Sequence, residues 1–575
     1  MHFLKWWRGP AKWLILRVDE KLLMFFIAAV VGVCAGLAAL LLNRSIGLLF
    51  EGLHHLRHHW WAIGLPAAGA ALSSVFLNKI LKEQPGHGIP EVIYSVSRYG
   101  GLLRFRLSFS RLISSCLTIG SGGSAGPEAP VVMSGAAIGS NIARFFALND
   151  RQRVILVGCG AAGAIASIFN APIAGIVFSM EVILGEWKAP NIIPIAIAAV
   201  AGTEISRTLQ GNQIVFSNPG FDLTFIDIPA CIGLAICTAL VSIFLTRAMK
   251  SMHHVSDRIS GIPKYLRAAI GGLCVGVIAL FFPVVLGEGY EFIQEMIAGV
   301  YSHGFLLLTV AVFAKVLATS LTLGWGGSGG IFAPSLVIGS LVGLSWHRLL
   351  MLLWPAATLT SEGGFALFGM AGVVSGMLQA PLTGIFLIVE ITGGYDVILP
   401  LIIVSAVSAT VCHYVEPASI YLKDLMEQGK LLRPGTDERV LADLSIHELI
   451  EKDCIPVARH MPLREFIEIV KTSRRNYFPV EDETTGHFLG LIHLDDVRPY
   501  LFNQGLYDAV FVEQIMTTHV TTVQPDDDLS EVLNHMDNHR HFSLPVVSEN
   551  RFVGMISKAT LLDQYRKELM VQTCE

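Results

Sequence analysis

Glu128 lies inside a strongly apolar part of this sequence, directly after the turn-forming residues Gly126 and Pro127. A carboxylate is costly in hydrocarbon surroundings and is usually kept there for a function. A helix that starts at this turn directs free N–H groups and the positive end of its dipole toward the acid, and the same groups bind anions. We therefore predict that Glu128 has a function, at a place that also suits a small anion.

The segment around Glu128 is repeated in the second half of the chain. Residues 118–139 align without a gap with residues 322–343, and residues 170–181 align with residues 379–390, at offsets of 204 and 209. Two blocks at a nearly constant offset indicate two homologous halves. Paired segments interrupted by Gly and Pro are typical of transporters in which the N-termini of half-helices meet near the midplane of the membrane.

Glu128 corresponds in this repeat to Phe332, and each stands after a Gly-rich turn and before Ala-Pro. We expect the positive ends of two helices to face each other here, which predicts an anion pathway at the junction of the halves. The competing interpretation is that the glycines only let helices pack closely. The prolines at both sites favour the pathway, because they break helices.

The elements that would position these residues are membrane helices. The chain is 53% hydrophobic and only 15% charged, whereas soluble domains contain about 25% charged residues. Leu22–Leu42, Ile228–Leu245 and Ala268–Phe282 are apolar and about long enough to cross ~30 Å of hydrocarbon. Val131–Ala147 and Ala171–Leu184 are shorter and contain Gly or Pro, so we expect helices that stop part-way through the membrane.

The composition changes near residue 420 from apolar to charged, and a charged stretch with Pro and Gly follows. In the charged tail, Leu463–Thr472 and Leu529–His535 are expected to be helices beside short apolar strands. We predict an all-α polytopic membrane domain of two inverted repeats followed by an α/β tandem domain pair. The predicted bounds are 1–20 for an N-terminal segment, 21–422 for the membrane domain with halves at 21–212 and 225–422, 423–439 for a linker, and 440–572 for the tandem domains at about 440–500 and 510–570.

Charge and cysteine patterns bound the orientation and the partners. Five Lys and Arg residues among the first 21 predict a cytoplasmic N-terminus, and the tail is then expected in the cytoplasm as well. A secretory signal is the alternative, but no small-residue cleavage site follows the apolar stretch. Nine scattered cysteines without C-x-x-C predict neither a disulfide framework nor a zinc site. A net charge of −5 argues against a nucleic-acid partner.

Four segments resemble motifs of the CLC family of chloride channels and proton/chloride exchangers. They are Gly86–Pro90 (GHGIP, for GSGIP), Gly126–Pro130 (GPEAP, for GREGP), Gly330–Pro334 (GIFAP, for GxFxP) and Tyr421 after the last membrane helix. The tail resembles a tandem pair of CBS domains. The resemblance covers about residues 20–422 and 440–570, and its motifs occur in the order and spacing of the family.

This resemblance implies chloride as the transported ion and a homodimer with a separate pore in each subunit. It implies a cytoplasmic-type bilayer, which we expect to be the plasma (inner) membrane of a prokaryote, with no required cofactor and no bound metal. It places the gating glutamate at Glu128. It places the anion-binding N–H groups and hydroxyl at Gly86, His87, Gly88, Ile331, Phe332 and Tyr421.

Three positions depart from the family pattern. His87 replaces a serine, so either its imidazole or only its backbone N–H would contact the ion. Pro127 replaces an arginine and removes a cation and an N–H beside the outer site. Val182 follows Glu181 where exchangers often carry a second acid that takes up protons from the cytoplasm; Glu181 itself matches Glu390 in the repeat, which favours a structural role for both. Because valine carries no proton, we favour a passive gated chloride channel over the alternative, a coupled proton/chloride antiporter.

Other patterns suggest other classes of protein. Ser124 fits the G-x-S-x-G of hydrolases, but Ser328 fits it too in the other half and no His lies beside both, which favours backbone geometry over an intramembrane hydrolase. A membrane-tethered nucleotide sensor without flux would not need intact pore motifs. Four histidines include i,i+4 pairs that could bind a metal ion on one helix face: His54, His55, His58 and His59. Without carboxylates nearby, we favour the interpretation that they form a hydrated surface at the membrane interface.

The CBS-like tail raises the question of a nucleotide. Members of the family that bind adenine nucleotides carry an Asp at the end of a G-x-I-S-x-x-D pattern, which contacts the ribose. Asp496 matches it in the first unit, although His493 replaces Ser or Thr; Ser557 matches it in the second unit, where Thr560 replaces Asp. Asp496 and Ser557 are thus the candidate nucleotide-binding residues, and a structural dimerisation module is the favoured alternative.

Overall fold

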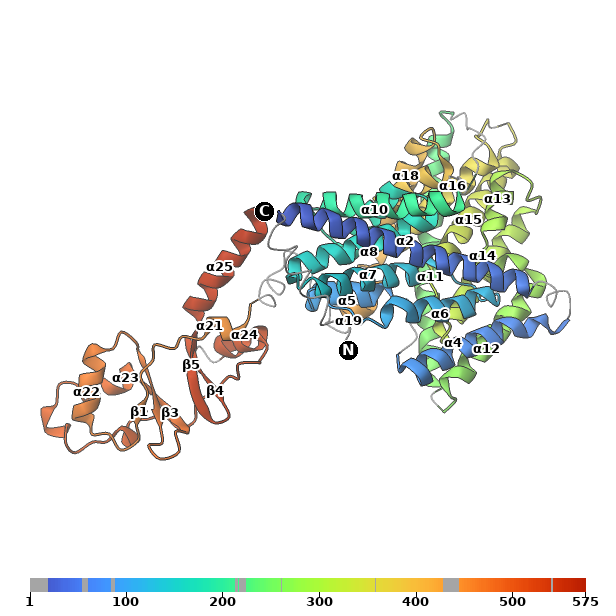
Figure 1. Ribbon diagram of the computed structural model, residues 1–575. Helices are drawn as coiled ribbons and strands as arrows, with labels where there is room; N and C mark the ends of the chain where they lie inside the picture. Colours follow the sequence, from blue (N-terminus) through green and yellow to red (C-terminus); the bar gives the residue numbers. More distant parts are fainter. Residues whose placement is uncertain are drawn as a thin grey trace. The chain divides into compact units, whose positions relative to one another are not determined.

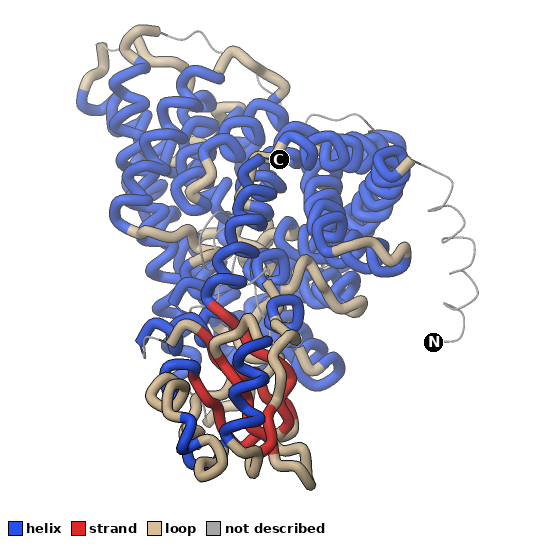
Figure 2. Tube along the Cα trace, turned by 90° about the vertical axis from the view of Figure 1, so that its left-hand side faces the viewer, coloured by secondary structure: helices blue, strands red, loops and turns tan. Residues whose placement is uncertain are grey.

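The computed structural model describes residues 19–53, 60–83, 88–211, 216, 224–259, 261–356, 358–427, 444–538 and 541–574. The chain forms two compact units, Met1–Leu431 and Leu432–Glu575. In the described residues the first unit is helical apart from loops, and all the strands belong to the second unit (Figures 1 and 2). The predicted fold class, a helical multi-span domain followed by an α/β region, is confirmed.

The first unit contains two similar series of helices. The first series is α2 (Glu20–Gly52), η1 (Trp60–Gly64), α4 (Leu65–Val75), η2 (Phe76–Leu81), α5 (Ile89–Arg98), α6 (Leu107–Gly120), α7 (Glu128–Phe145), α8 (Asp150–Phe169), α9 (Pro172–Phe178), η3 (Ser179–Leu184) and α10 (Ala189–Gln210). The second series is α11 (Asp227–Arg258), α12 (Lys264–Phe281), η4 (Pro283–Val285), α13 (Tyr290–Ile297), α14 (Phe305–Gly324), α15 (Phe332–Leu353), α16 (Glu362–Leu378), α17 (Pro381–Thr392) and α18 (Ile398–Val415), followed by α19 (Lys423–Glu427).

The two series pack in the same way. Helix α7 packs against α8 and α15 packs against α16, while α9 and α17 contact each other across the halves. Nine helices of the described residues are long and apolar enough to cross a membrane. Two of these nine helices, α2 and α11, contain the predicted spans Leu22–Leu42 and Ile228–Leu245. Helix α17 is one of the shorter apolar helices and has only 12 residues. The first unit therefore combines long helices with short ones.

The second unit contains two small α/β cores. Its elements are α21 (Ile446–Leu449), β1 (Val457–Ala458), α22 (Leu463–Thr472), β2 (Tyr477–Glu481), β3 (Phe488–His493), α23 (Leu494–Val497), η5 (Gln504–Leu506), η6 (Val512–Gln514), α24 (Leu529–Asn538), β4 (Ser543–Ser548), β5 (Arg551–Ser557) and α25 (Lys558–Cys574). Strand β2 pairs with β1 in parallel and with β3 in antiparallel, and β4 pairs with β5 in antiparallel. Helix α22 has the predicted bounds, and α24 is longer than predicted at its C-terminal end.

Candidate anion pathway

Helices α7 and α15 begin side by side at the junction of the two halves. The N–H of Gly126 donates to the carbonyl of Gly330 (2.8 Å), and the N–H of Gly330 donates to the carbonyl of Gly126 (2.6 Å). A Cβ on Gly126 would lie 2.8 Å from the Cβ of Ala333, so this approach requires glycine. Because Gly126 and Gly330 each stand two residues before a helix, the bridge joins two helix N-termini, whose free N–H groups and positive dipole ends suit an anion.

Hydroxyl groups hold the loops that lead into these helices. Thr118 Oγ1 accepts a hydrogen bond from the N–H of Ser328 (3.2 Å), and Thr322 Oγ1 accepts one from the N–H of Ser124 (3.1 Å). The Ser124 hydroxyl also hydrogen bonds with Thr319 Oγ1 (3.0 Å). The duplicated G-x-S-x-G serines are thus structural residues of the loops, as the repeat indicated.

Glu128 is the first residue of α7 and is buried, with 1% of its surface exposed. The Tyr290 hydroxyl at the start of α13 donates a hydrogen bond to Glu128 Oε1. Glu128 Oε2 has no hydrogen bond of normal geometry and faces the backbone amide of Ala333 in α15. The carboxylate therefore stands where the two helix N-termini meet, with one oxygen held and the other free to be displaced.

The corresponding residue of the second half fills the space with an aromatic ring. Phe332 is the first residue of α15, and its ring lies 5.8 Å from the ring of Phe169 and 6.3 Å from the ring of Phe178, measured between centroids. Ile331 precedes it as the helix cap and is fully buried. Tyr421 is also buried, and its hydroxyl has no hydrogen-bond partner among the described residues. The structure brings Glu128, Ile331 and Phe332 together, and Tyr421 is near enough to Glu128 to interact with it electrostatically.

The inner motif of the sequence is described only in part. Gly88 caps α5 with a φ of +81°, a conformation that favours glycine. Gly86 and His87 lie outside the described residues, and so do the four histidines considered for a metal. The predicted inner anion-binding residues therefore remain a prediction apart from the place of Gly88 at a helix start.

Two ionisable residues near Glu128 were not predicted from the sequence. Lys315 in α14 is fully buried, and its Nζ donates to the carbonyls of Val285 and Gly287 (3.2 Å each). These carbonyls belong to the loop that leads into α13 and Tyr290. Glu288 in the same loop has a buried Oε1 without a hydrogen bond, and it interacts electrostatically with Lys315 and Glu128. The rule that singled out Glu128, that charge inside an apolar segment is costly, would also have found Lys315.

Two further carboxylates hold the halves together. Glu181 accepts hydrogen bonds from the N–H groups of Leu382 (3.2 Å) and Thr383 (2.7 Å) at the start of α17. Glu390 accepts them from the N–H groups of Ile173 (3.0 Å) and Ala174 (2.7 Å) at the start of α9. Each acid caps a short helix of the other half, which neutralises the helix dipole and supports the structural role expected from the repeat.

In the tail, the candidate nucleotide residues make contacts within the chain. Asp496 is exposed and accepts a hydrogen bond from the N–H of His493 (3.3 Å) at the start of α23. The Ser557 hydroxyl donates to Glu451 Oε1 (2.6 Å), and Thr560 also hydrogen bonds with Glu451. In the second repeat of the tail, the hydroxyls of Ser557 and Thr560 are therefore already hydrogen bonded to the Glu451 carboxylate. In the first repeat, the carboxylate of Asp496 is accessible.

Comparison with known proteins gives matches over both units. The model of the voltage gated chloride channel family matches residues 68–413, and that of the CBS domain matches residues 446–503 and 512–567. The H(+)/Cl(-) exchange transporter ClcA of Vibrio cholerae is 30% identical over 403 residues, 66% of this chain and 84% of that protein. Chloride channel protein CLC-f of Arabidopsis thaliana is 28% identical over 581 residues, 86% of this chain and 71% of that protein. A crystal structure of a eukaryotic CLC transporter has the same fold, with a TM-score of 0.63 and 17% identity over 94% of this chain and 99% of that one.

Proposed function

We propose that this chain, which belongs to the voltage gated chloride channel (CLC) family and carries two CBS domains, conducts chloride passively. In this proposal Glu128 is the gate of the pathway. The family membership itself makes the protein an integral membrane protein for CLC-type chloride transport, and not an enzyme. The gate and the passive mode are the proposed part.

The observation that carries the proposal is the position of the Glu128 carboxylate. An ionised carboxylate at the meeting point of two helix N-termini occupies the place that suits chloride, because both are anions that need N–H donors. Protonation of Glu128, or its displacement by chloride, would free these donors. The hydrogen bond from Tyr290 to Glu128 Oε1 has to be broken for this displacement, and Oε2, which faces the backbone amide of Ala333, has no hydrogen bond of normal geometry.

Passive conduction is favoured because Val182 stands at the position where exchangers often carry a second acid that takes up protons from the cytoplasm. Val182 lies in the π-helical turn η3, and the neighbouring Glu181 is occupied by the N–H groups of α17. These hydrogen bonds hold the Glu181 carboxylate in one position, so it is poorly placed to move protons toward Glu128.

Coupled proton/chloride exchange is the second candidate. It is favoured by Glu288, which interacts electrostatically with Glu128 and Lys315 and would be able to exchange protons with Glu128. It is also favoured by the similarity to a protein named as an exchange transporter. In this alternative the proton would reach Glu128 without an acid at position 182.

The remaining parts of the proposal concern the rest of the pathway and the assembly. Gly86, His87 and Gly88 would supply inner donors, and Ile331, Phe332 and Tyr421 would surround the ion at the centre. The protein would be a homodimer with one pathway in each subunit, in a prokaryotic inner membrane with both termini in the cytoplasm. An adenine nucleotide would bind the CBS pair through Asp496, because Glu451 competes for Ser557.

The mode of transport is tested in proteoliposomes that contain the purified full-length protein. Chloride and proton fluxes are measured together under an imposed chloride gradient, at several pH gradients. We expect a reversal potential that follows chloride alone, whatever the pH gradient. Uphill proton movement with a fixed anion-to-proton ratio would establish the exchanger and contradict passive conduction.

A further inference from the structure

The buried lysine of α14 has a counterpart in the first half of the chain. Lys315 follows Arg111 by 204 residues, which is the offset that relates residues 118–139 to residues 322–343. Arg111 is 2% exposed, and Lys315 is fully buried. A cation inside a membrane domain is costly and is usually kept for a function. A buried cation at the same position of both halves therefore indicates a shared role.

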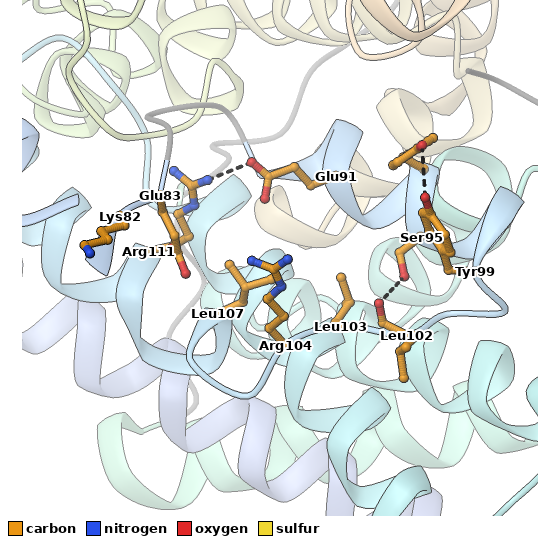
Figure 3. Close-up of a pocket in the computed structure, with 11 residues that line it drawn as sticks. Lys82, Glu83, Glu91, Ser95, Tyr99, Leu102, Leu103, Arg104, Leu107 and Arg111 are labelled. Carbon is orange, nitrogen blue, oxygen red and sulfur yellow. Dashed lines mark hydrogen bonds and ion pairs between the residues drawn. The ribbon is translucent and has the colours of Figure 1, made fainter. Parts of the chain in front are cut away.

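The first half shows what this cation contacts. Arg111 Nη2 donates to Glu91 Oε1 (2.7 Å), and Figure 3 shows the two side chains reaching toward each other. Glu91 lies in the first turn of α5, which begins directly after its cap, Gly88. Arg111 therefore connects α6 to the start of the helix that follows the predicted inner motif.

The loop before α13 resembles this inner motif. Gly287–Gly289 (GEG) repeats the pattern of Gly86–Gly88 (GHG) at an offset of 201. The last glycine of each set caps a helix with a positive φ, +81° before α5 and +83° before α13, a conformation that favours glycine. Helices α5 and α13 therefore start in the same way in the two halves.

Lys315 holds the loop before α13 from the side of α14. Its Nζ donates to the carbonyls of Val285 and Gly287 (3.2 Å each). The N–H of Gly287 in turn donates to the carbonyl of Gly122 (3.3 Å), in the loop that leads into α7. The ammonium group thus fixes the backbone directly before α13, and this backbone is also hydrogen bonded to the loop before α7.

The first residue of α13 is the donor to Glu128. Tyr290 donates its hydroxyl hydrogen to Glu128 Oε1, and its ring packs against Phe216 (5.9 Å between centroids). An O–H···O hydrogen bond needs about 2.5–3.0 Å between its oxygens, so a loop displaced by about 1 Å would break this contact. The position of the loop therefore decides whether Tyr290 reaches the carboxylate.

We propose that Lys315 is a positioning residue of the gate, which keeps Tyr290 in reach of Glu128 by holding the carbonyls of Val285 and Gly287. This inference rests on the proposed function of Glu128 as the gate, and it adds that α14 helps to keep the gate closed. The contact of Arg111 at the corresponding position supports this role, because it too fixes the start of a helix beside the proposed pathway.

The test measures chloride efflux from proteoliposomes that contain purified full-length variants. Lys315→Met removes the donor and keeps an unbranched side chain, so efflux should rise about as much as in Tyr290→Phe, roughly fivefold. The double variant should show this same rise, because both changes release one contact, whereas independent effects would multiply to roughly twenty-five-fold. Lys315→Arg keeps a cationic donor and should keep efflux low.

Further variants separate a failure of this inference from a failure of the gate. Lys264→Met, which removes an exposed lysine at the start of α12, should leave efflux unchanged. If Glu128→Gln alone does not raise efflux, the proposed gate is wrong. If Glu128→Gln raises efflux and Lys315→Met raises it further in that background, the gate stands and the positioning role is wrong.

Lys315→Gln removes the charge and shortens the side chain, and it replaces Lys315→Met in every comparison if the latter does not fold. Efflux in these two variants that equals that of Lys264→Met would overturn the inference. A fall in efflux would overturn it as well, because it would show that the charge of Lys315 attracts the ion and does not hold the gate closed. A multiplicative effect in the double variant with Tyr290→Phe would have the same consequence.

Discussion

Glu181 and Glu390 correspond in the two halves and accept hydrogen bonds from corresponding backbone N–H groups, each capping a short helix of the opposite half. Glu128 and Phe332 correspond as well, yet one is an acid bound by Tyr290 and the other is an aromatic ring packed against Phe169. The backbone at Glu128 and Phe332 is alike, because each is the first residue of its helix and Gly126 and Gly330 bridge the two helix starts. The side chains at the meeting point are where the halves differ.

This difference separates the structural residues from the functional ones. A helix start that is buried between the halves needs an acceptor on both sides of the repeat, so its capping acid is kept twice. A gate is needed only once in each pathway, so one half carries the acid and the other half a ring of fixed shape. We infer that symmetry in the repeat indicates a structural role, and that the asymmetric pair Glu128 and Phe332 marks the proposed chloride pathway.

The largest effect is expected from Glu128→Gln, which removes the charge at the asymmetric position. Hydrogen bonds to a charged group contribute about 1.5–3 kcal/mol, so the neutral side chain should open the pathway by roughly ten- to hundredfold. Chloride efflux from proteoliposomes should rise and should no longer depend on pH. Glu181→Gln is the control, because it keeps a capping oxygen and lies in the symmetric set; unchanged efflux and pH response in Glu128→Gln would remove the residue from the gate.

The next effect tests the symmetric pair through stability. Glu181→Ala and Glu390→Ala should each lower the free energy of unfolding by about 1–3 kcal/mol, because buried N–H groups lose their acceptor. Both losses are measured by thermal unfolding in the same detergent, and the loss in Glu181→Ala should be the larger, because the Thr383 hydroxyl also donates to Glu181 (2.7 Å), whereas the corresponding residue of α9 is Ala174. A large loss in one variant and none in the other would break the rule that symmetric acids are structural.

The smallest effect is expected from Tyr290→Phe, which removes the side-chain donor of the gate and keeps the ring that packs against Phe216. One hydrogen bond contributes about 1 kcal/mol net, so chloride efflux should rise roughly fivefold while its dependence on pH persists. Tyr301→Phe, in the loop after α13, is the matched control. If Tyr290→Phe behaves like this control, the hydroxyl does not hold the gate closed.

The sequence by itself determined the features that depend on local patterns. Apolar runs of spanning length located α2 and α11, and the change of composition near residue 420 separated membrane and soluble sequence. The glycine and proline turn before Glu128 predicted a helix start there, and α7 begins at that residue. The match of Glu181 with Glu390 indicated a shared structural role before their partners were known. Each of these follows from residue type and spacing within a few turns of the chain.

The tertiary structure decided the contacts between segments that are distant in sequence. Tyr290 holds Glu128 from 162 residues away, and no local pattern connects them. The buried position of Lys315 and the identity of its acceptors, Val285 and Gly287, likewise depend on how α14 packs against the loop before α13. The physical reason is that hydrogen bonds are satisfied by whichever donors and acceptors the packed helices bring together. The sequence placed Glu128 at a helix start, and the packing of the two halves brought Tyr290 to it.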